Sequence, residues 1–122
     1  MVQLSQLARI RQERHQAWLE QMRSRCHAVG DACLSHGVGI EQVLLFGSRA
    51  RGDFDGYSDI DLIAVGKTQI DAEAVADALA DAHLGDDLIA MSKQDWLQKA
   101  ESQSPSWRAI FAEAVILYKH NS

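Results

Sequence analysis

Apolar residues recur at helical spacing over the N-terminal part of the chain. Between residues 3 and 35 there is no proline, and apolar positions follow one another at steps of three or four: Trp18, Met22, Cys26, Val29 and Cys33. Residues at this spacing lie on one face of a helix, so the pattern predicts a long amphipathic helix. Glycines at 37 and 39 predict its end, because glycine caps helices and opens turns.

The first turns of this segment differ in pattern from the rest. Leu4, Leu7 and Ile10 form an apolar stripe that Arg11 and Arg14 interrupt. The segment therefore forms either a separate helix or an exposed docking surface, and the pattern leaves both possibilities open.

Beyond residue 39, short apolar runs alternate with helical patterns. The runs 43–46 and 60–65 are each followed by a glycine, and a third apolar run covers 88–91. Runs of this length between turn residues are typical of buried strands. Strands that alternate with helices predict a compact domain of the α+β or α/β class.

Three helices are predicted among and after these strands. Residues 70–84 place small apolar side chains on one helical face. Ser92 is suited to cap a helix that starts near Gln94, and Ser104-Pro105 matches a cap followed by proline in the first turn. The last helix is expected to carry one apolar stripe, formed by Trp107, Ile110, Phe111, Ala114, Val115 and Tyr118.

Length and composition fit one folded domain. The chain has 122 residues, 47% hydrophobic and 24% charged, a balance typical of folded proteins. We expect a single domain with a helical N-terminal segment over 1–36 and a core over 40–122. No apolar stretch approaches the length of a membrane span and the N-terminus does not resemble a signal peptide, so the expected location is the cytoplasm, without membrane contact. Cys26 and Cys33, seven residues apart on one helix, are too distant for a disulfide and are expected to be reduced thiols.

Charge is spread unevenly along the chain. Residues 1–36 carry five arginines and three acidic residues, a net charge of +2, whereas residues 37–122 carry seven basic and fourteen acidic residues, a net charge of −7. Non-specific nucleic-acid binding needs a broad cationic face, because neutralisation of phosphates supplies most of its affinity. Direct binding to nucleic acid is therefore not expected, although the N-terminal arginines suit an acidic partner.

A glycine and a serine follow the first predicted strand. Gly47 to Gly52 has the glycine spacing of a P-loop, but Asp53 and Phe54 stand where that loop requires lysine and serine or threonine, which excludes a Walker-type site. Gly47 and Ser48 are instead expected to end a strand and lead into a helical turn. There glycine allows close backbone approach, and free N–H groups can face a phosphate.

Ten residues separate Ser48 from a pair of aspartates that flank an isoleucine. Residues two apart on a strand share a face, so Asp59 and Asp61 are expected to project together. Adjacent carboxylates repel and are costly to bury unless a cation neutralises them. Magnesium meets that need, because it takes oxygen ligands and bridges carboxylates to substrate phosphates. Two such ions could stabilise the attacking and leaving oxygens of a phosphoryl displacement.

The stretch GSRARGDFDGYSDIDLIAV resembles the signature of the minimal nucleotidyltransferases in the DNA polymerase β-like superfamily. In that signature Gly-Ser is followed, after ten residues, by Asp-x-Asp, which Gly47, Ser48, Asp59 and Asp61 match. The resemblance implies a nucleotidyltransferase fold, with a small mixed sheet flanked by helices in the α+β class. It also implies transfer of a nucleoside monophosphate from a triphosphate such as ATP to a hydroxyl, with two Mg²⁺ ions as cofactor and release of pyrophosphate.

Family members bring a third carboxylate from a later strand, and the resemblance offers Asp86 or Asp87 for it. Asp87 is favoured because it directly precedes the apolar run, although the family commonly has an apolar residue where this chain has Asp86. The expected catalytic and metal-binding residues are thus Asp59, Asp61 and Asp87. The expected nucleotide-binding residues are Gly47, Ser48 and Arg51.

Among the two arginines after Ser48, Arg51 is favoured for phosphate binding because family members often show its Ala-Arg-Gly context, whereas Arg49 is as well explained as a surface residue. In the following loop, Asp53 and Asp55 are expected to be structural, because Asp-Gly at 55–56 favours a tight turn. Phe54 and Tyr57 are expected to be exposed near the site.

Many small members of the family are similar to antitoxins that neutralise a HEPN ribonuclease toxin by binding it and adding AMP to a toxin tyrosine. The resemblance therefore implies a protein adenylyltransferase with a HEPN-type toxin as partner. Two alternatives stay open, a non-catalytic binding module of the same fold and an enzyme that modifies a small molecule. A nucleic-acid acceptor is not expected, because it would require cationic contacts and stacking aromatics along a groove.

Overall fold

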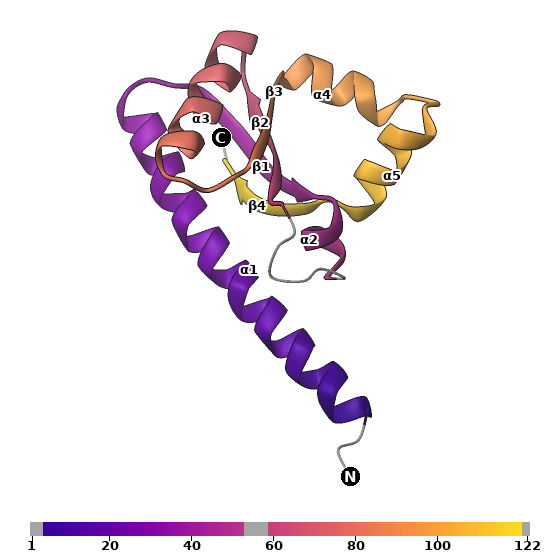
Figure 1. The fold of residues 1–122 in the computed structure, drawn as a ribbon. Coiled ribbons are helices and arrows are strands. Elements are labelled where there is room, and N and C mark those ends of the chain that lie inside the picture. The colour runs from indigo at the N-terminus through magenta and orange to yellow at the C-terminus, as the bar shows by residue number, and fades with distance from the viewer. Residues whose placement is uncertain (1–3, 53–58, 121–122) are drawn as a thin grey trace.

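The chain folds around a four-stranded sheet with strand order β3-β2-β1-β4, in a computed structural model that describes residues 4–52 and 59–120 (Figure 1). The central strand β1 (Ile40–Phe46) pairs antiparallel with β2 (Asp61–Gly66) and with β4 (Val115–Lys119). The edge strand β3 (Asp87–Ser92) runs parallel to β2. The predicted mixed sheet flanked by helices is confirmed.

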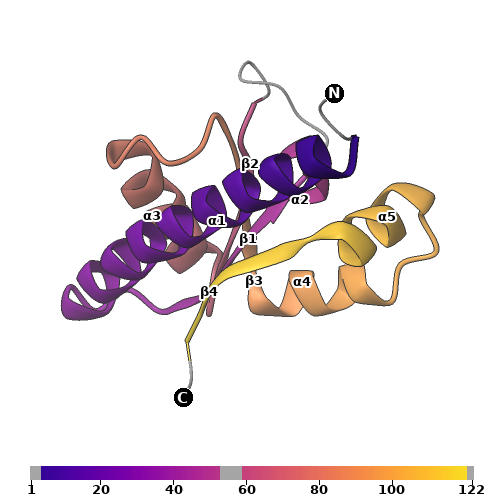
Figure 2. The same ribbon diagram turned by 90° about the horizontal axis from the view of Figure 1, so that it is seen from below.

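Helices lie on both faces of this sheet. The long α1 (Leu4–Ser35) and α3 (Gln69–Asp81) cover one face, and α4 (Lys93–Ala100) and α5 (Pro105–Glu113) cover the other (Figures 1 and 2). The short α2 (Ser48–Arg51) directly follows β1. The sheet is thus the middle layer of three.

The central strands are buried on both faces, which explains their continuous apolar runs. In β1, Val43 and Leu45 belong to the core shared with α1 and α3, whereas Leu44 belongs to the core beneath α4 and α5. This alternation follows from the pleat of a strand, which points successive side chains to opposite faces. A strand covered on one face only would have shown alternating polar residues.

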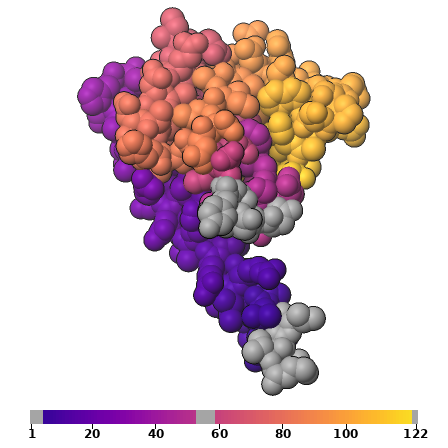
Figure 3. Space-filling view, in the orientation of Figure 1, coloured from indigo at the N-terminus to yellow at the C-terminus, as the bar shows by residue number. Residues whose placement is uncertain are grey.

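The N-terminal segment is one continuous helix, not two. Its second half packs on the sheet through Leu19, Met22, Cys26 and Cys33, which are all buried. Its first turns, residues 5–14, are exposed and project beyond the sheet (Figures 1 and 3). Leu7 and Ile10 are 44% and 45% exposed there.

Both cysteines are free thiols, as expected. Burial raises the pKa of Cys26 to about 11, so this thiol stays protonated at neutral pH. Among the described helices, none has the length and apolar character needed to cross a membrane.

The contrast between the two halves of α1 gives a first prediction. Deleting residues 1–11 should change the free energy of unfolding by less than about 1 kcal/mol, because the described residues among them are exposed. Gly30→Ala should instead destabilise the protein by about 1–3 kcal/mol, because overpacking outweighs the helix propensity that alanine adds. The new Cβ would lie 2.5 Å from the buried Tyr118 ring. Urea unfolding measures both free energies. If the truncated chain does not fold, the projecting turns are needed for the core and the prediction is wrong.

The predicted C-terminal helix is wrong in its second half. α5 begins after Ser104 with Pro105 in its first turn, as expected, but it ends at Glu113. Ala114 adopts extended backbone, with φ −62 and ψ 139, and the chain continues as β4. Val115 and Ile116 are β-branched and favour strands, and β4 covers an edge of β1 that would otherwise be open. The helical stripe extends too far in the prediction because Val115 and Tyr118 also suit a strand.

Candidate active site

Two aspartates stand at the starts of neighbouring parallel strands. Asp61 is the first residue of β2 and Asp87 the first residue of β3, and the register pairs them directly. Paired residues of adjacent strands share one face of the sheet. The two carboxyl groups lie close together, and like charges at such a distance repel when both are ionised.

Asp86, the other candidate for the third carboxylate, is engaged with the backbone. Its Oδ2 accepts the N–H of Ile60 at 2.8 Å. In return, the N–H groups of Asp86 and Asp87 donate to the Ile60 carbonyl at 2.8 and 3.2 Å. These bonds fix the start of β3 against the residue before Asp61. The structure therefore brings Asp87 beside Asp61 and uses Asp86 to hold the two strand ends together.

The prediction that Asp59 and Asp61 share one strand face is wrong. β2 begins at Asp61, and Asp59 lies before it with an exposed side chain. The Asp86 side chain takes up the N–H of Ile60, and the Ile60 carbonyl accepts from Asp86 and Asp87, so the residue before Asp61 is tied to the start of β3. Asp59 is nevertheless near enough for its charge to raise the pKa of Asp61.

The pKa of Asp61 is raised above its ordinary value by its surroundings. Burial is the largest cause, followed by the hydrogen bond to Asp87 and the negative charges of Asp87, Asp59 and Asp86. Four carboxyl groups thus gather at one end of β2 and β3. Such a cluster is costly when ionised unless a cation is bound.

The raised pKa predicts how the stability of the metal-free protein depends on pH. The folded state holds a proton on Asp61 that the unfolded state releases, so stability is lost as the pH rises above the ordinary value of 3.8 toward the folded pKa. In EDTA at pH 7, Asp61→Asn should therefore raise the melting temperature by a few degrees. Asp77→Asn, an exposed position on α3, is the control and should leave it unchanged. A lower melting temperature for Asp61→Asn would contradict the prediction.

Gly47 brings the backbone against the carboxylate of Asp61. Its φ of 79 and ψ of −159 lie in a region that essentially only glycine adopts. A Cβ at this position would lie 2.7 Å from Asp61 Oδ2. Gly47 also opens the helical turn α2, whose first residue is Ser48, as predicted. The Gly-Ser pair therefore lies beside the aspartates, with the Asp61 carboxylate where a side chain at position 47 would otherwise be.

The two arginines of α2 have partners away from the aspartates. Arg51 Nη1 donates to Glu113 Oε2 of α5 at 3.0 Å, and the Arg49 guanidinium lies 4.9 Å from the centre of the Trp18 ring of α1. The two contacts tie α2 to a helix on each face of the sheet. Because exposed ion pairs are weak, Arg51 can leave Glu113 for a phosphate, and its nucleotide-binding role stays a prediction.

The donor set at the aspartates fits magnesium. Within residues 4–52 and 59–120, no three acidic, histidine or cysteine side chains converge on one point where they could hold a metal ion. Magnesium does not need three, since it is usually bound by one or two carboxylates together with water and substrate phosphates. Asp61 and Asp87 supply the carboxylates, and Gly47 lets the backbone approach the Asp61 carboxylate closely. The predicted loop residues Asp53, Phe54, Asp55 and Tyr57 lie outside the described part of the chain.

This combination of a Gly-Ser turn and paired acidic residues on a mixed sheet is that of a nucleotidyltransferase. Comparison with protein families agrees, because residues 31–122 match the family model described as "Polymerase beta, Nucleotidyltransferase". The chain therefore belongs to this nucleotidyltransferase family. No curated protein matches it in sequence.

Solved structures share the fold. A protein of Sulfolobus solfataricus classed as a nucleotidyltransferase is 21% identical, with a TM-score of 0.50 and 86% of each chain covered. A toxin–antitoxin structure with AMP-PNP is 18% identical, with a TM-score of 0.50, covering 80% of this chain and 73% of that one. A protein classed as a minimal nucleotidyltransferase is 25% identical, with a TM-score of 0.49, covering 80% of this chain and 93% of that one.

Proposed function

We propose that this nucleotidyltransferase moves AMP from ATP to a hydroxyl of a partner protein. The observation that carries the proposal is the Asp61–Asp87 pair at the starts of β2 and β3, with the Gly47 backbone directly against the Asp61 carboxylate. Such an arrangement suits phosphoryl transfer, in which catalysis consists mainly of positioning and charge neutralisation.

In the proposed reaction, the acceptor oxygen forms a bond to the α-phosphorus of ATP while the bond from that phosphorus to pyrophosphate breaks. Asp59, Asp61 and Asp87 would hold Mg²⁺, which when bound neutralises charge on the phosphates. Gly47 and Ser48 would bind the β- and γ-phosphates through backbone N–H groups and the serine hydroxyl, with Arg51 as a further phosphate contact. Asp87 would help to take up the proton that the acceptor hydroxyl loses.

The proposed partner is a toxin of the HEPN type. Two observations support a protein acceptor over a nucleic acid. The segment 37–122, which carries the motif, has a net charge of −7, which opposes binding of a polyanion. One structure of the same fold is a toxin–antitoxin structure with AMP-PNP. Such a pair is expected to be located in the cytoplasm.

The proposal predicts that nucleotide and metal bind as a unit. Mg²⁺ with ATP at about 100 times the dissociation constant should stabilise the fold by about 2.7 kcal/mol, because a ligand that binds only the folded state raises its stability. The double variant Asp59→Asn with Asp61→Asn should fold but lose this gain. Thermal melts with Mg²⁺ alone, ATP alone and both together measure the effect.

Two outcomes of that experiment separate the alternatives. If the double variant responds to Mg²⁺ and ATP as fully as the wild-type chain, the assignment of these aspartates is wrong. If the wild-type chain binds ATP but no labelled AMP appears on a HEPN-type protein purified with it, the chain is a binding module and not an adenylyltransferase.

A further inference from the structure

The face of α1 that packs in the core changes character near the site. Its buried members are Leu19, Met22, Cys26 and Cys33. Followed toward the N-terminus at steps of four, four and three, the same face carries His15, Arg11 and Ala8. A face that is apolar where it meets the sheet thus becomes polar where it passes α2. Arg11 is exposed, and His15, which is half-buried, lies against the end of α2.

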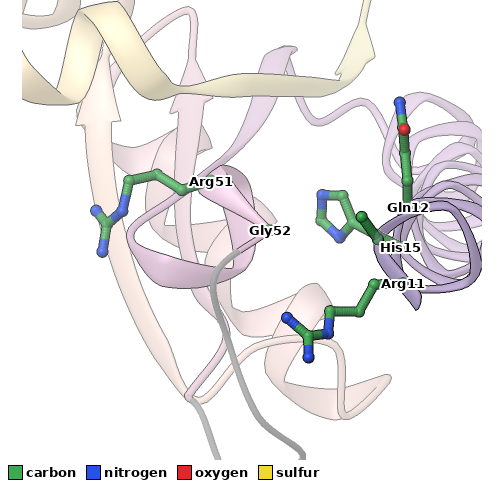
Figure 4. A pocket seen from close by; sticks show the side chains of 6 residues that line it. Arg11, Gln12, His15, Arg51 and Gly52 are labelled. Carbon is green, nitrogen blue, oxygen red and sulfur yellow. The ribbon is translucent and has the colours of Figure 1, made fainter. Parts of the chain in front are cut away.

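A cavity of about 260 Å³ lies between α1 and α2. It is lined by Ala8, Arg11, Gln12 and His15 of α1 and by Arg51 and Gly52 at the end of α2. In Figure 4, Arg11 and His15 project from α1 toward the side of Gly52, Gln12 points in another direction, and the Arg51 side chain runs away from them. A Cβ on Gly52 would lie 3.3 Å from the His15 ring, so the two helices meet closely at this point.

The lining indicates the chemistry of the occupant. Arg11 and Gln12 bring N–H donors to the cavity, and a guanidinium forks readily onto a carboxylate. The Arg51 guanidinium is bound to Glu113 at 3.0 Å, away from the cavity. The segment 1–36 is also the part of the chain with positive net charge. The occupant is therefore acidic.

Size and position favour an acidic side chain over a nucleotide. Pockets for small molecules usually measure about 300–1,000 Å³, more than this cavity. Gly47, beside Asp61, and Gly52, at the cavity, bracket α2, and five residues of helix span about 7–8 Å. An extended peptide rises about 3.3 Å per residue, so two or three residues cover that distance.

We propose that this cavity binds an acidic side chain of the acceptor protein, two or three residues from the hydroxyl that is modified. The inference rests on the proposed transfer to a protein hydroxyl and adds a specificity element to it. Arg11 is the residue on which it depends most, because its charge comes from α1, outside the segment that matches the family. α1 thereby becomes part of the substrate site as well as a support for the sheet.

Binding of synthetic peptides tests the inference without relying on catalysis. Two fluorescent peptides carry one tyrosine, with either glutamate or lysine two residues before it, and are titrated with the full chain in the presence of Mg²⁺ and the ATP analogue AMP-PNP. The glutamate peptide should bind about tenfold more tightly, which corresponds to about 1.4 kcal/mol. Arg11→Glu should remove or reverse that preference, and Arg11→Lys should retain part of it. Arg9→Glu is the matched control, since the same charge change falls on nearly the opposite face of the helix.

Each outcome bears on one of the two proposals. Equal binding of both peptides, or equal loss with Arg9→Glu and Arg11→Glu, overturns the inference. So does an Arg11→Glu variant that loses AMP-PNP affinity instead of peptide preference, because the occupant would then be the nucleotide. The experiment is then repeated with labelled ATP in place of AMP-PNP. If the peptide preference still depends on Arg11 but neither a peptide nor the partner protein becomes labelled, the result counts against the transfer reaction and leaves the site for the acidic side chain standing. Equal labelling of both peptides supports the transfer reaction and rejects the site for an acidic side chain.

Discussion

Asp61→Ala should lower the rate of AMP transfer by about 10³-fold or more, because it removes a carboxylate from the point where metal and phosphates must be held. Asp61 is the residue on which the site converges. It is paired with Asp87 in the strand register, near the charges of Asp59 and Asp86, and in contact range of the Gly47 backbone. No other aspartate among the described residues combines these three relations.

The measurement is transfer of labelled AMP from ATP to the partner protein, with equal amounts of folded variant and wild type. Asp77→Ala removes the same charge from an exposed position on α3 and should leave the rate within about twofold, as substitutions away from a site usually do. Asp87→Ala should resemble Asp61→Ala. A transfer rate for Asp61→Ala close to that of the Asp77→Ala control would show that the carboxylate pair is not the reacting centre.

Much of the site could be predicted from spacing because its parts are close in sequence. Gly47 and Ser48 follow one central strand and Asp61 starts the next, and an antiparallel pair brings those ends together, with Phe46 opposite Asp61. Local periodicity placed these two ends within one residue, although β1 begins at Ile40, earlier than the predicted run 43–46. The pairing of Asp61 with Asp87 needed one further fact, that β2 and β3 run parallel in that register.

The errors in prediction come from backbone bonds that the sequence does not display. Asp59 left the strand because Asp86 binds the N–H of Ile60, a contact between residues 26 apart in the chain. The terminal helix gave way to β4 because an edge of β1 was available for pairing. In both cases tertiary structure overrode a local pattern that was itself reasonable.

The polar residues of the α1–α2 cavity had a sequence signal that the helical pattern obscured. Arg11 was read as an interruption of the stripe formed by Leu4, Leu7 and Ile10. In the structure, Arg11 and His15 continue the other stripe, the one that packs on the sheet. Arg11 is exposed there, but it shares the helix face that meets the sheet further along α1.

Gly47→Ala should lower transfer by at least about 10²-fold and destabilise the fold by about 1–3 kcal/mol, the usual cost of a residue held in a disallowed backbone region. Two separate effects act here. The backbone at φ 79 and ψ −159 is strained for any side chain, and the new methyl group would collide with Asp61 Oδ2, 2.7 Å away. The second effect acts on the reaction, because it displaces the carboxylate on which the proposed metal binding depends.

Gly37→Ala separates the two effects. Gly37 also has a positive φ, of 76, but a Cβ there would meet nothing within 4 Å, so only backbone strain is added. This variant should lose stability, by about 1 kcal/mol, and transfer AMP at the wild-type rate. Chemical denaturation and labelled transfer are measured on both variants at a temperature where each is folded. If Gly47→Ala loses stability but keeps its transfer rate, the close approach of Gly47 to the Asp61 carboxylate is not needed by substrate or metal, and the phosphates must bind elsewhere.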